Sequence, residues 1–442
     1  MISNRLARNA VWNLGSLAAP MLVALVAIPA LIRTLGPDRF GILTLAWMLI
    51  GYCSLFDLGL GRALTKLVSE GMENHSGLAS GVWTALALMA ALGSVGALIF
   101  AAIAGPLTHS FLKIPPALQQ ETATSLLWIA AAIPVVTLTA GLRGILEARQ
   151  RFASISIVRT VMGVLTFLGP LVAAQTQGGL PSVILSIVLV RFASLAAYGA
   201  LGAALEPELF SDRRVRLDQA GPLLRFGGWL TISNLLSPLM VSMDRFLVGA
   251  FLSVTALAYY AIPYEIVSKL QVIPAAVTGV LFPAFSSSLV SDPARARRLY
   301  ARGLRVIAGT VAPLAAIVVA FAYPGLRLWL GEEFAGHGYR VLQLLAIGVL
   351  INSAANIPSS YLHASGRPDV NAKLHMIEFP LYVILACWLI RGWGIEGAAL
   401  AWVMRVTLDA ALLFWLARRS SPAPWRIQWE VANAGSGISA SR

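Results

Sequence analysis

Long apolar runs, separated by short polar breaks, constrain the fold of this chain more than any other feature. A helix needs about 20 apolar residues to cross a bilayer, where its backbone groups must be bonded within the segment. Only 12% of the 442 residues are charged, against roughly 25% in soluble domains. The sequence therefore predicts an all-α integral membrane protein with twelve transmembrane helices: 11–33, 40–61, 81–104, 122–143, 155–176, 181–204, 223–250, 254–286, 303–326, 339–361, 370–391 and 395–417.

One run, 254–286, is longer than a simple span requires and contains Pro263, Pro274 and Pro283. An interior proline removes a backbone hydrogen bond and clashes with the preceding turn of a helix. We therefore expect a kinked or broken helix in this run.

Basic residues are distributed unevenly between the two sides that the runs define. With the N-terminus inside, 23 of the 33 lysines and arginines fall in the cytoplasm or at its edge, and 6 fall on the opposite side. Short cytoplasmic loops of membrane proteins are enriched in lysine and arginine. The net charge of +13 therefore indicates topology rather than nucleic-acid binding, and both termini are expected to be cytoplasmic.

The polar stretch 205–221 divides the runs into two sets of six. We expect an N-terminal six-helix bundle (1–204), a cytoplasmic linker (205–221), a C-terminal six-helix bundle (222–420) and a cytoplasmic tail (421–442). A weak internal repeat with an offset of 217 residues supports the division, since it sets Trp12 on Trp229. An even helix count places both bundles in the same orientation, so the repeat predicts a parallel pseudo-two-fold along the membrane normal and a central cavity.

Charges inside the runs are the candidate functional residues, because a charge at a helix centre costs about 2.5–3.5 kcal/mol on insertion scales. A polar cavity between the bundles would account for them. They are Asp57, Arg191, Asp244, Arg245, Glu265, Lys269, Glu378, Arg405 and Asp409.

Each of these charges also has a purely structural interpretation. Glu265 and Lys269 have the i, i+4 spacing of a helical ion pair, and Arg405 and Asp409 share this spacing. Arg191 has no acidic residue at helical spacing, which favours an anion contact. Asp57 and Arg62, at the inner end of the second run, could interact with nearby backbone groups and the membrane interface instead of binding a ligand.

Five residues leave both interpretations possible. Asp57 could satisfy backbone groups near the glycines, while Arg62 reaches the interface. Asp244 and Arg245 could form a functional site or lock helix packing. Glu378, before Phe379-Pro380, could couple transport to protons or pair with another arginine.

Motifs for enzymes, cofactors and metals are missing from the sequence. There is no H-E-x-x-H, G-x-S-x-G or G-x-x-x-x-G-K, and the five histidines show no metal-ligand spacing. The match to G-x-G-x-x-G at 392–397 lies between two spans rather than between a strand and a helix, so it does not indicate a dinucleotide site. The sequence predicts no catalytic residue, no cofactor and no metal site.

Four motifs resemble those of the polysaccharide (O-antigen type) flippases of the multidrug/oligosaccharidyl-lipid/polysaccharide exporter superfamily. The first extends over residues 9–70 and includes LGPDRFG at 35–41 and FDLGLGRA at 56–63. The others are LRGILEARQRF at 142–152, MDRFLVG at 243–249 and EFPLY at 378–382. Together they cover nearly the whole chain to about residue 417.

The resemblance implies two six-helix bundles around a cavity that opens alternately to the two sides. The implied substrate is a polyprenyl-diphosphate-linked oligosaccharide, moved from the cytoplasmic to the outer leaflet. Membrane lipid and a polysaccharide polymerase are the further expected partners, and nucleic acid is not. The implied diphosphate or sugar contacts are Arg62, Arg143, Arg191 and Arg245, and the implied ion-coupling carboxylates are Asp57, Asp244 and Glu378.

Two other classes are compatible with the runs. An ion-coupled multidrug antiporter of the same superfamily would place acidic residues in the cavity, whereas the charges here lean basic. A membrane glycosyltransferase should carry acidic residues in a large outer loop, but the longest outer loop, 105–121, contains only Glu121. The flippase interpretation is therefore favoured.

Overall fold

The computed structural model describes residues 2–70, 77–176, 179–211, 214–216, 218, 220–221, 240 and 242–419. Within these ranges the regular structure is entirely helical. The chain forms two compact units, Met1–Ser242 with Gly249–Ala258 and Met243–Val248 with Tyr259–Arg442. We describe each unit separately as the N-terminal and the C-terminal unit.

Within the described ranges, nine helices are long and apolar enough to cross a membrane. Two of them contain a non-helical glycine, Gly36 or Gly394, and each combines two of the runs expected from the sequence. Most of run 223–250 lies outside the described residues. An all-α, multi-pass membrane protein is therefore confirmed, while the count of twelve, the two six-helix bundles and their domain limits stay predictions.

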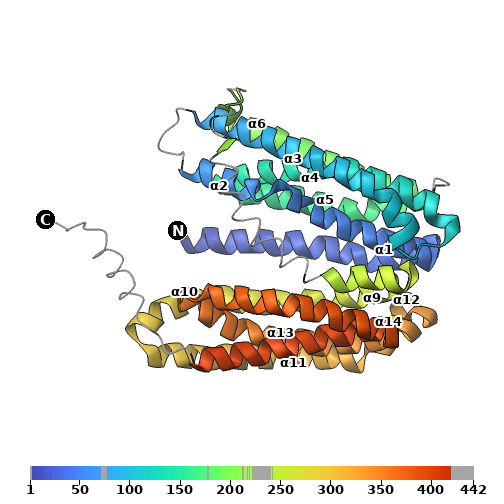
Figure 1. The fold of residues 1–442 in the computed structure, drawn as a ribbon. Coiled ribbons are helices and arrows are strands. Elements are labelled where there is room, and N and C mark those ends of the chain that lie inside the picture. The colour runs from blue at the N-terminus through green and yellow to red at the C-terminus, as the bar shows by residue number, and fades with distance from the viewer. Residues whose placement is uncertain are drawn as a thin grey trace. The chain divides into compact units, whose positions relative to one another are not determined.

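In the N-terminal unit, α1 (Ile2–Tyr52) reverses direction at Gly36, where φ is 76° and ψ is 165°. A straight helix of 51 residues would be about 77 Å long, far more than the roughly 30 Å of a bilayer core. Figure 1 shows the N-terminus and α2 (Leu60–Glu70) at the same end of the unit, as a hairpin requires. The expected polar turn at 35–41 is thus reduced to one non-helical glycine.

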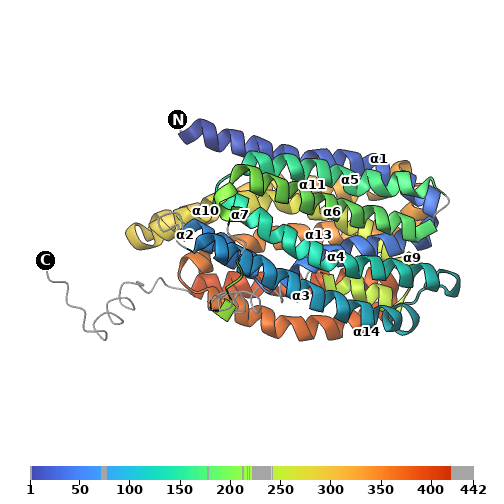
Figure 2. The same ribbon diagram turned by 90° about the horizontal axis from the view of Figure 1, so that it is seen from above.

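The remaining helices of this unit are α3 (Leu78–Pro106), α4 (Pro116–Ala148), α5 (Phe152–Ala174), α6 (Gly179–Leu205) and the short α7 (Pro207–Ser211). Helix α4 packs between α3 and α6, and α5 packs against α1 and α6 (Figure 2). The core contains Leu60, Val82, Met89 and Ile145, all fully buried. It lies at the end of the unit where α2 begins.

The expected span 40–61 is interrupted, and the structure corrects this prediction. The second arm of α1 ends at Tyr52, a 3₁₀ turn covers Cys53–Asp57, and α2 starts at Leu60. Leu58 and Gly59 have φ values of 48° and 73°, a left-handed conformation that ends a helix. The Asp57 carboxylate accepts a hydrogen bond from the Gly59 N–H at 2.8 Å and stabilises this turn.

The LGPDRFG motif makes structural contacts at the hairpin turn of α1. The Arg39 guanidinium makes two hydrogen bonds to the Glu121 carboxylate, at 3.0 and 2.8 Å. The Thr255 hydroxyl donates to Asp38, and a Cβ atom on Gly41 would lie 1.9 Å from the Val254 carbonyl oxygen. The motif therefore holds the turn against α4 and the start of α9.

The C-terminal unit contains most of α9 (Val254–Ser268), followed by α10 (Val272–Ser291), α11 (Pro293–Ala320), α12 (Ala322–Leu330), α13 (Glu332–Ala364) and α14 (Pro368–Arg419). Helix α13 is central, since it packs against α10, α11, α12 and α14. The expected break in run 254–286 is confirmed by a 3₁₀ turn at Lys269–Gln271.

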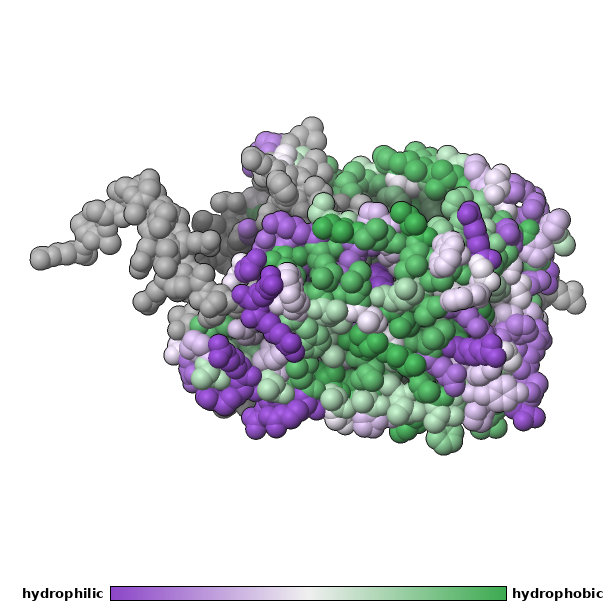
Figure 3. All heavy atoms as spheres, turned by 60° about the horizontal axis from the view of Figure 1, so that its bottom comes forward, coloured by the Kyte–Doolittle hydropathy of each residue, from purple (hydrophilic) through white to green (hydrophobic). Residues whose placement is uncertain are grey.

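Helix α14 is a second hairpin, with its turn at Gly394 (φ 60°, ψ −136°). A Cβ atom on Gly397 would lie 2.1 Å from the Leu389 carbonyl oxygen, so the two arms meet backbone to backbone. On the face in Figure 3, hydrophobic residues form a band across the middle and hydrophilic residues gather at both ends. This is the surface pattern of a membrane-spanning protein.

Candidate functional site

Three of the predicted site residues come together in the N-terminal unit. Asp57 lies in the turn before α2, Arg62 is exposed on α2, and Arg143 is exposed on α4. Both arginines interact electrostatically with Asp57. Arg143 also forms an ion pair with Glu147 one helical turn away, at 3.2 Å. This group is polar and accessible.

Arg191 lies apart from that group, partly buried in the middle of α6. Its Nη2 donates to the Thr166 hydroxyl at 3.3 Å. The Nε atom is buried, with no hydrogen-bond partner in the part of the chain that the structure describes. Among the described residues the side chain therefore contacts a neutral hydroxyl, and the anion contact expected from the sequence stays a prediction.

Asp244 is the most deeply buried charge of the predicted site, with 0% exposure. Its two carboxylate oxygens have different partners. Oδ2 accepts a hydrogen bond from the Tyr260 hydroxyl at 2.5 Å, and Oδ1 accepts one from the Arg245 N–H at 2.8 Å. Donors on both oxygens stabilise the carboxylate in a place where water cannot reach it.

Two guanidinium groups lie over tyrosine rings near Asp244. The Arg245 Cζ atom is 4.4 Å from the centre of the Tyr264 ring, and the Arg405 Cζ atom is 5.4 Å from that of Tyr382. These distances are within the range of cation–π attraction. Both arginines interact electrostatically with Asp244. We call this group the arginine–tyrosine cluster: Asp244, Arg245, Tyr260, Tyr264, Tyr382 and Arg405.

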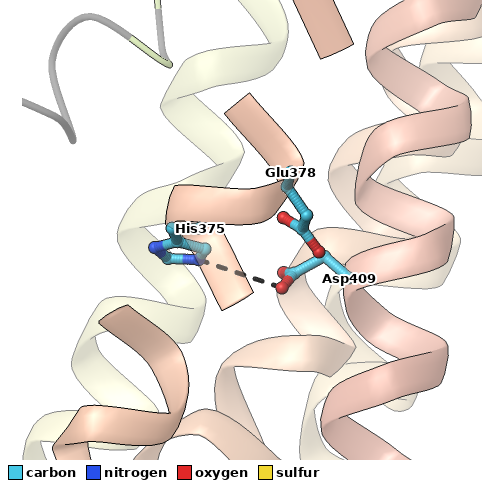
Figure 4. A group of neighbouring side chains, drawn as sticks. All are labelled: His375, Glu378 and Asp409. Carbon is cyan, nitrogen blue, oxygen red and sulfur yellow. Dashed lines mark ion pairs between the residues drawn. The ribbon is translucent and has the colours of Figure 1, made fainter. Parts of the chain in front are cut away.

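Glu378 lies in a second group on the two arms of α14, which we call the carboxylate cluster: His375, Glu378 and Asp409. Figure 4 shows the three side chains pointing toward one another. One ligand atom from each lies within 4.8 Å of the others, and His375 Nε2 is 3.8 Å from Asp409 Oδ1. Glu378 is 3% exposed and Asp409 is 6% exposed. Buried carboxylates thus face each other across the hairpin.

Sequence reasoning missed part of both clusters. The Glu265–Lys269 pair is confirmed at 2.9 Å, but Arg405 and Asp409 make no ion pair with each other among the described residues. Arg405 lies over Tyr382 instead, and Asp409 faces His375. The three tyrosines and His375 were not predicted, because aromatic and histidine side chains in a membrane span carry no charge pattern that marks them.

An apolar groove of about 420 Å³ also lies in this unit, between α11, α13 and α14. Ile307, Leu350 and Phe414 are among its lining residues, and no charged residue lines it. The groove therefore cannot supply the polar contacts that a charged substrate needs. The charged side chains of the two clusters lie elsewhere in this unit.

The fold defines the class of protein. Over 92% of this chain and 97% of the other, it is similar to the inward-facing structure of a multidrug resistance MATE family transporter of the MOP superfamily, with a TM-score of 0.74 and 15% identity. A eukaryotic MATE transporter, AtDTX14, gives a TM-score of 0.59 at 16% identity, over 92% of this chain and 97% of that one. The chain has the fold of a MOP superfamily transporter.

The sequence defines the family. Residues 30–338 match the model of the polysaccharide biosynthesis protein family, and the chain belongs to this family. A Shigella flexneri protein named as an O-antigen transporter is 29% identical over 93% of this chain and 97% of its own length. The lipopolysaccharide biosynthesis protein WzxC of Escherichia coli is 23% identical over 85% of this chain and 73% of its own. The resemblance seen in the four motifs is thereby confirmed.

Proposed function

We propose that this protein is a flippase that moves a polyprenyl-diphosphate-linked oligosaccharide from the cytoplasmic to the outer leaflet by alternating access. The observation that carries the proposal is membership of the polysaccharide biosynthesis family, with relatives named as an O-antigen transporter and a flippase. The fold of a MOP superfamily transporter supports it. The product would enter surface polysaccharide biosynthesis in the bacterial inner membrane.

The proposed substrate contacts are the arginines of the predicted site. A diphosphate requires compensating charge in a low-dielectric environment, and arginine supplies it with several hydrogen-bond donors. Arg191 and Arg245 are the inner contacts, because both are partly buried within spans. Arg62 and Arg143 are exposed and would meet the head group first. Arg405, which stands over Tyr382, joins this set as a further contact.

Asp57, Asp244 and Glu378 are the proposed ion-coupling carboxylates. Asp244 and Glu378 are almost completely buried, so gaining or losing a cation there changes the charge of a dehydrated region. A change of that kind can bias a two-state transporter toward one of its conformations. Both termini are proposed to be cytoplasmic, and a polysaccharide polymerase is the proposed partner that receives the product.

Replacement of the inner arginines tests the proposal. Arg191→Ala and Arg245→Ala should each reduce glycan export at least tenfold, because the diphosphate loses a charge contact. The assay quantifies polyprenyl-linked oligosaccharide and surface polysaccharide in a deletion strain that expresses each variant. Arg298→Ala is the matched control, since Arg298 is exposed on α11 and pairs with Asp292 at 3.3 Å.

The expected result is accumulated lipid-linked glycan in the two inner variants, with normal amounts of inserted protein. Normal export from both would contradict the proposed contacts.

The second candidate, an ion-coupled multidrug antiporter, is favoured by the fold likeness to a multidrug transporter. An antiporter function predicts normal glycan export and increased drug sensitivity in the deletion strain. Measuring both properties in that strain therefore distinguishes an antiporter from a flippase.

A further inference from the structure

The carboxylate cluster contains three buried carboxylate oxygens that accept no hydrogen bond from an N–H or hydroxyl group among the described residues. Within the described part of the chain, no N–H or hydroxyl group donates to either oxygen of Glu378, although the residue is 97% buried. Asp409 Oδ1 is likewise buried without a hydrogen-bond partner there. Asp244 in the same unit has the usual arrangement for a buried carboxylate, in which each oxygen accepts a hydrogen bond. Two facing buried carboxylates with such oxygens as those of Glu378 and Asp409 are stabilised by a positive charge between them, either a shared proton or a bound cation.

Arg405 does not supply that cation by direct contact. It lies on the same arm as Asp409, and its guanidinium stands over the Tyr382 ring at 5.4 Å. The structure shows no ion pair within 4.0 Å between Arg405 and either carboxylate among the residues it describes. Arg405 therefore attracts the Glu378 and Asp409 carboxylates electrostatically without contacting them. Its guanidinium group does not lie between the two carboxylates.

The third member of the cluster, His375, distinguishes the cations that could bind. An imidazole nitrogen and two carboxylate oxygens suit Zn²⁺ and its neighbours among the transition metals, whereas Na⁺, Mg²⁺ and Ca²⁺ prefer oxygen ligands. A proton shared by the two carboxylates has no need of the imidazole. We propose that His375, Glu378 and Asp409 bind one divalent transition-metal ion, with Zn²⁺ as the model ligand.

The geometry requires little rearrangement. Zinc binds nitrogen and oxygen ligands at about 2.0–2.2 Å, which sets neighbouring ligand atoms roughly 3.4 Å apart in a tetrahedron. The three donor atoms already lie within 4.8 Å of one another, so side-chain rotations that move each by about 1 Å would close the site. The fourth position would be taken by water, as in other zinc sites with three protein ligands.

Access comes through His375, whose side chain is 40% exposed while that of Asp409 is 9% exposed. His375 lies seven residues after the start of α14, about 10 Å along the helix. A metal ion can therefore reach the imidazole first and then pass to the buried carboxylates. Because His375 and Glu378 lie on the first arm of α14 and Asp409 on the second, the bound ion would join the two arms.

Direct metal binding to the full-length protein in lipid nanodiscs, after removal of any affinity tag, tests the proposal. Isothermal titration with Zn²⁺ should show one saturable ion per chain, and His375→Ala, Glu378→Gln and Asp409→Asn should each weaken binding at least tenfold. Zn²⁺ should also raise the Tm of the native protein but not of these variants. His109→Ala and Glu396→Gln are controls, since His109 hydrogen-bonds Gln119 and Glu396 pairs with Arg340, and neither is a member of the cluster.

Co²⁺ gives an independent readout, because a tetrahedral protein site makes its visible absorption much stronger than that of the octahedral hydrated ion. Size-exclusion profiles confirm that each variant is folded, and His375→Ala leaves both buried carboxylates in place. The proposal is overturned if the native protein binds no Zn²⁺, or if His375→Ala binds it as tightly as the native protein. The second result would mean that the carboxylates share only a proton or bind a metal without the imidazole.

The inference goes beyond the proposed flippase function, because binding is measured without transport. A native protein that exports glycan normally but binds no Zn²⁺ would overturn the metal site alone. Zn²⁺ binding with normal export from the inner-arginine variants would overturn the substrate contacts alone.

Discussion

A buried carboxylate can be kept in a membrane protein in two ways, and this chain contains both. Asp244 has a hydroxyl donor and an N–H donor, whereas Glu378 has neither among the described residues. The first arrangement holds a charge in place, and the second leaves the charge dependent on a cation. Gaining or losing a cation at Asp244 therefore alters two existing hydrogen bonds, whereas at Glu378 it alters none among the described residues.

The tyrosine that donates to Asp244 should contribute measurably to stability. Tyr260→Phe removes one donor from a fully buried carboxylate and should lower the free energy of unfolding by about 1–3 kcal/mol. Tyr382→Phe is a matched control, because its buried hydroxyl has no hydrogen-bond partner in the described part of the chain. Thermal unfolding in detergent compares the two, and equal Tm values would contradict this role of Tyr260.

Charged residues could be predicted from the sequence, but most of their partners could not. Asp244 and Arg245 stand out in an apolar run, and the Glu265–Lys269 pair follows from helical spacing. Tyr382, in contrast, is more than a hundred residues from Asp244. A contact of this kind depends on tertiary packing, which periodicity within one helix does not encode. The pairing of Arg405 with Asp409 failed for the same reason, since both had better partners on other segments.

At the scale of elements, glycines set the hairpins. The runs expected from the sequence match the arms of α1 and α14, except that the second arm of α1 ends at Tyr52 rather than at residue 61. The structure needs only Gly36 and Gly394, each with a positive φ that other residues rarely adopt. The interruption of run 40–61 at Leu58 and Gly59 could not be read from hydropathy, because Asp57 is the one charged residue in that run.

Substitution of the glycine that packs at the α14 turn should open the hairpin. In Gly397→Ala the new methyl group would lie 2.1 Å from the Leu389 carbonyl oxygen, and backbone on both sides would have to move. We expect a loss of about 1–3 kcal/mol, typical of overpacking. Gly392→Ala, five residues earlier, is the matched control because its methyl group would meet no atom within 4 Å.

The measurement is again thermal unfolding in detergent, together with Zn²⁺ titration. Gly397→Ala should lower both the Tm and the affinity for the metal, since the carboxylate cluster spans the two arms. Gly392→Ala should change neither. A native-like Tm for Gly397→Ala would mean that the arms do not approach as closely as the structure shows.

At the scale of the whole molecule, the distribution of arginine and lysine predicts which ends of the spans face the cytoplasm. Lys113 lies between α3 and α4, on the expected outer side, and Arg295 lies at the start of α11, on the expected inner side. The geometry of the helices does not show which end of each span faces the cytoplasm. The topology is therefore a prediction from charge and requires a measurement of its own.

Cysteine accessibility provides that measurement. In a background without Cys53 and Cys387, a membrane-impermeant maleimide should label Lys113→Cys in intact spheroplasts and Arg295→Cys only after permeabilisation. The positive-inside rule is the physical reason, because arginine-rich loops are retained in the cytoplasm. The reverse pattern would invert the topology and with it the proposed direction of transport.

The hairpin of α14 also has a consequence for the order in which the protein is made. His375 and Glu378 are synthesised before the turn at Gly394, and Asp409 follows only after it. During synthesis, the first arm enters the bilayer while its acidic side chain still lacks the facing carboxylate. The carboxylate cluster therefore does not exist on either arm alone, and it is assembled only when the ribosome has delivered the second arm and the hairpin has closed.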